Sequence, residues 1–177
     1  MSEEKFTFFW NGPFSQWASS YFTINSITYN TAEQYMMAQK AIMFGDEAML
    51  LKIMESDDPR TQKVCGRNVE NFDPNRWNAY AKAIVTDGSM AKFTQNPKLL
   101  ESLLLTEGTT LVEASPKDKI WGIGLAANDP KAQSRETWNG LNWLGEVLTV
   151  VRDTIIASPF KMIWDLRNGY TTTLRYD

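Results

Sequence analysis

The amino-acid sequence contains no histidine, and that absence excludes more mechanisms than any other feature of its composition. Without imidazole the chain has no Ser-His-Asp triad, no Cys-His couple and no histidine-ligated zinc site. The zinc deaminase design fails too, because it needs a histidine ligand and a pair of cysteines. Any chemistry must therefore use carboxylates, amides, cations and aromatic rings.

Cysteine and long apolar runs are also scarce. The single cysteine, Cys65, cannot form an internal disulfide, which is typical of a reducing compartment. No run approaches the ~18 apolar residues that a membrane-spanning helix needs, and the N-terminus lacks signal-peptide character. We therefore expect a cytoplasmic protein that acts in its own cell or in the cytosol of an infected host, with no membrane partner.

The charge and the length indicate one acidic globular unit. The 177 residues include 18 Lys and Arg against 21 Asp and Glu, a net charge of −3. This balance argues against a protein that coats nucleic acid through a broad basic face. The length is usual for one domain, for which about 100–200 residues is typical, and we find no repeat, linker or low-complexity segment.

The order of the predicted elements is that of an α+β fold in which helices dominate. β-prone residues predict strands over residues 6–10 and 110–114 and a hairpin over residues 21–29 that turns at Asn25-Ser26. Asn168-Gly169 predicts a second hairpin near the C-terminus. Caps, prolines and glycines predict helices over residues 31–44, 46–54, 58–66, 74–95, 96–105 and 141–157, with Gly88 marking a point where the fourth can break.

Two carboxylates are candidates for chemistry. Glu33 lies in the first turn of a predicted helix, where backbone N–H groups and the helix dipole stabilise a carboxylate. A glutamate there is also an ordinary helix-start residue or half of a capping box. Asp118 lies in a loop just before Trp121, where an ordinary turn residue is the simpler interpretation.

Aromatic residues are the second unusual feature, with seven tryptophans in the chain. Trp10, Phe14 and Trp17 share one early turn-rich segment, and Trp121 lies in the late loop. Flat rings in such segments can stack on a base or a sugar, although most tryptophans in a globular protein belong to the core.

Glycines and cations supply further candidates. Gly122-Ile123-Gly124 lets a backbone approach a ligand closely, but it lacks the third glycine of a dinucleotide fingerprint. Lys40, Arg67 and Lys92 are candidate phosphate ligands, although each residue type is more often solvated or laid over the core.

Ordered motifs cover nearly the whole chain. The most specific are Glu33-Gln34-Tyr35 with Gln39-Lys40, and Ala114-Ser115-Pro116 with Asp118 and Ile120-Trp121-Gly122-Ile123-Gly124-Leu125. Others are Phe9-Trp10, Phe14-Ser15-Gln16-Trp17, Gly66-Arg67, Trp77, Met90-Ala91-Lys92-Phe93, Leu111-Val112-Glu113, Asn128-Asp129-Pro130, Trp138, Asn142, Leu144-Gly145 and Arg152. Together these motifs resemble the NADAR (YbiA-like) family over residues 6–157, whereas residues 158–177 form an extension without a family counterpart.

The resemblance implies a compact, mostly helical α+β domain with short strands beside the pocket. It also implies hydrolysis of the N-glycosidic bond between a ribose and a nitrogen base, in phosphoribosylamino-pyrimidine intermediates of riboflavin synthesis or in ADP-ribosylated guanine. By resemblance Glu33 is the catalytic glutamate, with Asp118 beside it. The predicted substrate-binding residues are Trp10, Phe14, Lys40, Arg67, Trp77, Trp121, Gly122 and Asn142. Departures from the family pattern at Gln16, Ala81 and Leu141 bear on substrate choice.

The chemistry of this bond fits the residues present. Its cleavage passes through an oxocarbenium-like sugar, so a carboxylate near C1′ stabilises positive charge and can activate water. We expect Glu33 to deprotonate the attacking water or to stabilise the cation, and Asp118 to orient a ribose hydroxyl or assist the departing nitrogen. The resemblance implies no cofactor and no metal.

The expected partner is a small nucleotide-like substrate that carries a ribosyl or ADP-ribosyl base, or such a base within a nucleic acid. Two other classes stay open. One is a module that binds ADP-ribose or a related nucleotide without cleaving it. The other is an interaction protein whose C-terminal hairpin pairs with a second subunit.

Overall fold

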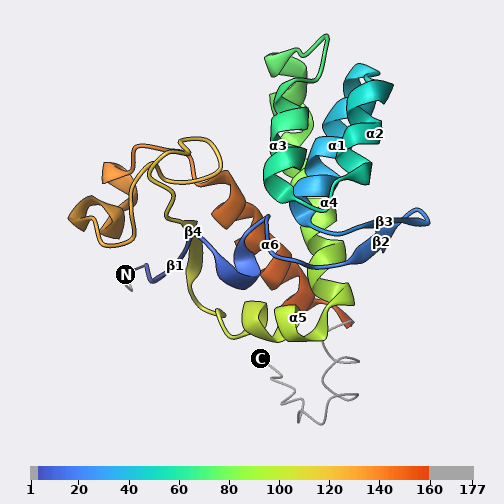
Figure 1. Ribbon diagram of the computed structural model, residues 1–177. Coiled ribbons are helices and arrows are strands. Elements are labelled where there is room, and N and C mark those ends of the chain that lie inside the picture. The colour runs from blue at the N-terminus through green and yellow to red at the C-terminus, as the bar shows by residue number, and fades with distance from the viewer. Residues whose placement is uncertain (1–3, 160–177) are drawn as a thin grey trace.

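The computed structural model describes residues 4–159, in which helices form most of the fold and two very short sheets lie on opposite sides of it (Figure 1). The helices are α1 (Ala32–Phe44), α2 (Glu47–Glu55), α3 (Pro59–Arg67), α4 (Pro74–Gln95), α5 (Pro97–Leu104) and α6 (Trp143–Ala157). The strands are β1 (Phe6–Phe9), β2 (Phe22–Ile24), β3 (Ile27–Tyr29) and β4 (Thr110–Glu113). Single 3₁₀ turns cover Gly12–Phe14, Pro130–Gln133 and Arg135–Thr137. The predicted α+β fold with dominant helices is confirmed.

The helices begin where the sequence places capping groups. The side chain of Thr31 accepts a hydrogen bond from the backbone N–H of Gln34 at 3.0 Å and starts α1. Aspartates at positions 46, 58 and 73 accept backbone N–H groups in the same way at the starts of α2, α3 and α4. Gly45, with a φ of 71°, ends α1 in the left-handed conformation that favours glycine.

Helix α4 runs without interruption through Gly88, so the break considered there is wrong. A side chain at this position would collide with the ring of Tyr35 on α1, because a Cβ on Gly88 would lie 2.5 Å from Tyr35 Cδ1. The glycine therefore serves close packing of α4 against α1 and leaves the helix intact.

The two sheets bring distant segments together. Strands β2 and β3 form the predicted hairpin, in which Asn25 and Ser26 both have positive φ, at 50° and 65°. Strands β1 and β4 pair in parallel, with Phe9 opposite Glu113. This pairing joins residues that are about a hundred positions apart, and it sets the end of β4 beside the segment that follows β1.

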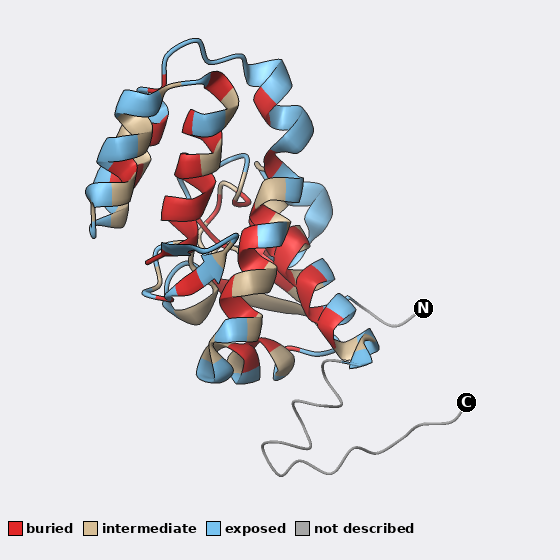
Figure 2. Ribbon diagram, turned by 90° about the vertical axis from the view of Figure 1, so that its right-hand side faces the viewer, coloured by how far each residue is buried: buried red, intermediate tan, exposed pale blue. Residues whose placement is uncertain are grey.

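Helix α1 passes through the middle of the fold. It packs against α2, α3 and α4, and ten of its thirteen residues are buried. Figure 2 shows the buried segments concentrated in such central helices, with exposed residues on the outer faces. A helix that is buried nearly all round also buries its polar residues, and Glu33 is one of them.

None of the helices within residues 4–159 is both long and apolar enough to cross a membrane. The hairpin predicted at Asn168-Gly169 lies outside the residues that the structure describes.

Candidate active site

Glu33 lies at the buried N-terminal end of α1. Glu33 is 3% exposed, and its backbone N–H donates a hydrogen bond to the carbonyl of Gln16 at 3.0 Å. The segment before β2 is thereby held against the start of α1. Among the described residues, the side-chain oxygen Oε1 of Glu33 is buried and has no hydrogen-bond partner. Because a buried polar atom without a partner is costly, this oxygen is a candidate for contact with a ligand.

The surroundings of Glu33 favour its protonated form. Burial raises the pKa of this carboxyl from its ordinary value of 4.5 to about 7. The positive charge of Lys63, a hydrogen bond from the side chain of Trp17 and the positive charge of Arg67 oppose this rise, whereas the negative charge of Asp118 adds to it. A carboxyl with a pKa near neutrality can act as an acid or as a base at physiological pH.

A second carboxyl of the same kind belongs to Glu113, the last residue of β4. Its oxygen Oε2 is also buried without a partner among the described residues. Burial, together with the negative charges of Asp118 and Glu33, raises the pKa of Glu113 to about 7, and the positive charge of Lys63 opposes this rise. Glu33, Glu113 and Asp118 therefore share one electrostatic environment, although they come from a helix, a strand and a loop.

Glu113 was missed as a site residue in the sequence. It stood within a strand pattern, where a glutamate is usually on the solvent face. The signal that identifies it is the pairing of β4 with β1, which no local pattern contains.

Asp118 organises the loop that follows β4. Its oxygen Oδ1 accepts the backbone N–H groups of Ile120 at 2.9 Å and Trp121 at 2.8 Å, and its carbonyl accepts that of Gly124 at 3.0 Å. The simpler interpretation, that of a turn residue, therefore holds for its geometry, while its charge still acts on both glutamates.

Gly122 packs inside the same loop. A Cβ at this position would lie 2.9 Å from the carbonyl oxygen of Glu113 and 3.0 Å from that of Asp118. The missing side chain lets the loop close on the end of β4. The structure thus gives Gly122 a packing role against the backbone of Glu113 and Asp118.

Asn142 fixes the end of β4 from the other side. Its Oδ1 accepts the backbone N–H of Glu113 at 2.9 Å, and its Nδ2 donates to the carbonyl of Leu111 at 3.0 Å. It has a φ of 53°, which is why α6 begins at Trp143 and not at the predicted Leu141. Its amide therefore positions the backbone of Glu113, whereas the family resemblance predicted Asn142 as a substrate-binding residue.

The cations of α1 and α3 differ in their relation to Glu33. Lys63 and Arg67 are one turn apart on α3, and the charges of both act on Glu33. Lys40 lies two turns beyond Glu33 on α1, where its Nζ is 4.0 Å from the ring centroid of Phe72 and 5.8 Å from that of Trp77. Burial lowers the pKa of Lys40, and Arg67 lowers it further. Within residues 4–159 none of these three cations forms an ion pair.

Lys92 is the exception among the candidate phosphate ligands. It is buried, its Nζ donates to the carbonyl of Ser15 at 2.8 Å, and burial lowers its pKa to about 7. This lysine ties α4 to the segment that precedes Trp17, in agreement with the alternative of a side chain laid over the core.

The aromatic candidates differ in exposure. Trp10 is 63% exposed and Trp17 is 41% exposed, with Lys63 Nζ 5.8 Å from the ring of Trp17. Phe14 and Trp121 are half-buried, and Trp121 meets Trp143 edge-on at 5.6 Å. Trp77 is buried under Lys40. Trp10 and Trp17 therefore offer the most open stacking surface, and Trp121 offers part of one.

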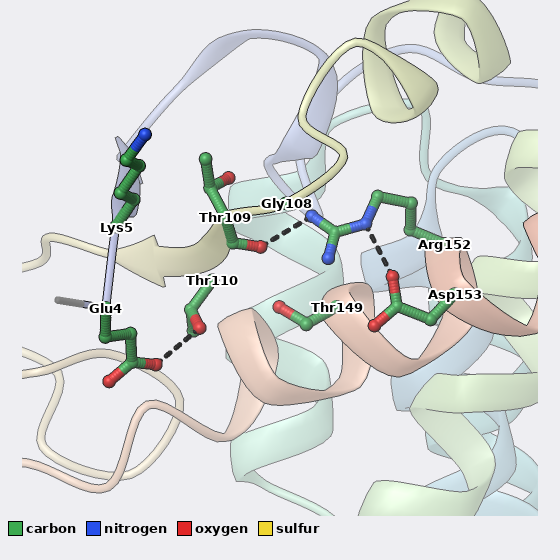
Figure 3. A pocket seen from close by; sticks show the side chains of 8 residues that line it. All are labelled: Glu4, Lys5, Gly108, Thr109, Thr110, Thr149, Arg152 and Asp153. Atoms are coloured by element: carbon green, nitrogen blue, oxygen red, sulfur yellow. Dashed lines mark hydrogen bonds and ion pairs between the residues drawn. The ribbon is translucent and has the colours of Figure 1, made fainter. Parts of the chain in front are cut away.

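The larger of the two described hollows lies elsewhere. Figure 3 shows this hollow of about 670 Å³, which is lined by residues at the Glu4 and Thr110 end of the paired strands, away from Glu113. Its arginine, Arg152, donates from one nitrogen to the carbonyls of Thr106 and Thr109, both at 2.7 Å. Because this cation is engaged by the backbone and the hollow holds no unpartnered buried carboxyl, we favour the carboxylates as the site.

The site can move protons without histidine. Two carboxyls with pKa values near neutrality repel each other, so at neutral pH the pair holds about one proton. Such a pair can supply both an acid and a base. Among residues 4–159 no group of three His, Cys, Asp or Glu side chains is arranged to hold a metal ion.

Comparisons with known proteins converge on one family. The model of the NADAR domain matches residues 6–156. The N-glycosidase R617 of Acanthamoeba polyphaga mimivirus is 49% identical over 125 residues, which make up 71% of this chain and 74% of that protein. The riboflavin biosynthesis protein VVA0006 of Vibrio vulnificus is 27% identical over 142 residues, or 80% of this chain but 35% of that protein.

A solved structure has the same fold. The NMR structure of the Escherichia coli protein YbiA superposes with a TM-score of 0.71 and 22% sequence identity. The match covers 99% of this chain and 94% of that chain.

Proposed function

This chain belongs to the NADAR family, and on that premise we propose that it is a hydrolase that cleaves the N-glycosidic bond between a ribose and a nitrogen base. The ribose is phosphoribosyl or ADP-ribosyl. The observation that carries the proposal is the carboxyl of Glu33, which is buried, has an unpartnered oxygen among residues 4–159 and has a pKa raised to about 7.

Glu33 acts at the anomeric carbon of the ribose. As the C1′–N bond lengthens, positive charge develops on the sugar, and a carboxylate beside it stabilises that charge more than it stabilises the neutral ground state. The same carboxylate takes a proton from the attacking water. Neither step needs histidine, which the chain lacks.

The cations of α3 whose charges act on Glu33 recognise phosphate. Lys63 and Arg67 carry charges that reach Glu33, and in the described part of the chain they have no acidic partner. A phosphorylated ribose whose C1′ lies at Glu33 brings its phosphate toward these side chains. Lys63 was not singled out in the sequence, because a lysine inside a predicted amphipathic helix reads as a solvated residue.

The names of the relatives guide the choice of substrate. The family includes a protein named as an N-glycosidase and one named as a riboflavin biosynthesis protein. We therefore propose two substrate classes for testing, phosphoribosylamino-pyrimidines and ADP-ribosylated guanine. The second includes a modified base within a nucleic acid.

The test is to incubate the wild-type protein and Glu33→Gln with both substrate classes and to measure the free base by chromatography and mass spectrometry. We expect the wild type to release base from at least one substrate and Glu33→Gln to lose about a hundredfold or more of that rate. Glu47→Gln is the matched control, because Glu47 is an exposed first-turn glutamate on α2.

Two results would overturn the proposal. One is a folded Glu33→Gln that releases base at the wild-type rate. The other is a wild-type protein whose melting temperature rises with the ligand while the ligand mass stays unchanged, as a binding module predicts.

A further inference from the structure

The backbone of Glu113, at the end of β4, is fixed by three hydrogen bonds from outside the strand pairing. Its N–H donates to Asn142 Oδ1 at 2.9 Å, and its carbonyl accepts the N–H groups of Ser115 and Ile123, both at 2.9 Å. Gly122 packs directly on that carbonyl. The side chain therefore projects from a fixed point, which is what a group that must meet a reacting atom needs.

The side chain itself is poorly satisfied. The buried Oε2 of Glu113 has no hydrogen-bond partner in the part of the chain that the structure describes, and neither does the buried Oε1 of Glu33. Among residues 4–159 three buried side-chain oxygens lack a hydrogen-bond partner, and two of them belong to these glutamates. Buried polar atoms normally have hydrogen-bond partners. Two unpartnered carboxyl oxygens, on glutamates whose charges interact, therefore indicate a place for polar atoms of a ligand.

We propose that Glu113 is the proton donor of the reaction and delivers its proton to the nitrogen of the departing base. This assignment rests on the proposed N-glycosidase function. The C1′–N bond breaks with its electron pair on nitrogen, which takes the proton of Glu113. A C1′–O bond forms from water, and Glu33 takes the proton that water loses. One water is consumed, and the two glutamates regain their starting protonation by exchange with solvent.

Asp118 is less suited to that role. Two backbone N–H groups already occupy its Oδ1, and they shape the turn that carries Trp121. Asp118 is therefore a positioning residue that also repels negative charge on both glutamates. The other charges that act on the pair are Lys63 and Arg67 on α3, of which Lys63 acts on both glutamates and Arg67 on Glu33.

The protonation of the pair agrees with the proposal. The pKa of each glutamate is raised to about 7, chiefly by burial. Groups that interact in this way titrate as a pair, so near neutrality one is protonated and the other ionised. This is the state that acid and base catalysis at a single bond needs.

The test compares leaving groups. Glu113→Gln and Glu33→Gln are assayed with the ribosyl base that the wild type cleaves and with a nitrophenyl riboside that carries the same phosphate, because nitrophenolate leaves without a proton. We expect Glu113→Gln to lose about a hundredfold or more with the nitrogen base and much less with the nitrophenyl riboside. Glu33→Gln loses rate with both. The basic limb of the pH–rate profile disappears in Glu113→Gln. Glu136→Gln, an exposed glutamate of the adjoining loop, is the control.

Equal losses of rate with the two substrates in folded Glu113→Gln, or an unchanged pH–rate profile, would overturn the assignment. If Glu113→Gln does not fold, Glu113→Asp keeps the acid but withdraws it by one methylene. Wild-type rates with both substrates in that variant would also overturn it. Failure of the wild type to cleave any ribosyl base contradicts the proposed function itself, which is a different result.

Discussion

Replacing Glu33 by glutamine should stabilise the protein at alkaline pH, because the folded protein holds this carboxylate in a buried position. The residue is 3% exposed, and burial raises its pKa from 4.5 to about 7. A carboxyl whose pKa is raised by folding contributes stability that is fully present below its ordinary pKa and is lost as the pH rises through its folded pKa. The loss therefore falls between about pH 4.5 and about pH 7.

The magnitude follows from the gap between the two pKa values. That gap corresponds to about 3 kcal/mol of unfolding free energy at pH 8, at about 1.4 kcal/mol for each pH unit, and to less than about 1 kcal/mol at pH 5. The advantage of Glu33→Gln over the wild type should therefore grow by about 2 kcal/mol between the two pH values. Any fixed cost of burying the amide cancels in this difference.

The assay is urea unfolding followed by tryptophan fluorescence at pH 5 and pH 8, with Glu47→Gln as the exposed control. We expect the control to show the same difference from the wild type at both pH values. If Glu33→Gln also showed the same difference at both, folding would not raise the pKa of the buried carboxyl, and the electrostatic account of the site would be refuted.

Three further predictions test the surroundings of the glutamates. Asp118→Asn keeps the oxygen that accepts two N–H groups but removes a charge that raises the pKa of both glutamates, so the pH–rate profile of hydrolysis should move to lower pH; a profile that stays in place would contradict the coupling. Asn142→Ala removes two hydrogen bonds to β4 and places alanine at a φ of 53°, so urea unfolding should show a loss of about 2–4 kcal/mol, with a smaller loss for Asn142→Gly, and wild-type stability in the alanine variant would exclude this role. Lys63→Gln and Arg67→Gln should each raise KM about tenfold for a phosphorylated substrate and leave KM for a phosphate-free riboside nearly unchanged, whereas equal effects on both substrates would argue against phosphate contact.

Local signals in the sequence predicted the elements that depend on a few neighbouring residues. Thr31 caps the start of α1 and Gly45 ends it, and Asn25-Ser26 forms the turn of the hairpin. Glu33 could be located at a helix start for the same reason. These features are local because each is decided by hydrogen bonds within a few residues.

The remainder depends on contacts that no short window contains. In the sequence Gly88 is interpreted as a helix breaker, and only the structure shows that it makes room for the ring of Tyr35. Glu113 becomes a candidate site residue only through the parallel pairing of β4 with β1 and the charge of Glu33 that acts on it. In the sequence Lys92 resembles a surface cation, and only the structure shows that the segment of Ser15 covers it.

The role of Asn142 was the least accessible from sequence. Its motif predicted a substrate-binding residue, and in the structure its amide holds the backbone of Glu113 and Leu111. A pattern of residue types does not reveal whether a polar side chain faces a ligand or a backbone group.

Hydrolysis of a ribosyl–nitrogen bond, the reaction that we propose for this protein, leaves an oxygen from water at C1′ of the ribose product. The most direct measurement is mass spectrometry of the products after the wild-type protein is incubated in heavy-oxygen water with a phosphoribosylamino-pyrimidine and, separately, with an ADP-ribosylated guanine nucleotide. We predict free base and a ribose product that carries one heavy oxygen at C1′ from at least one substrate. Both substrates recovered with unchanged mass would contradict the proposal.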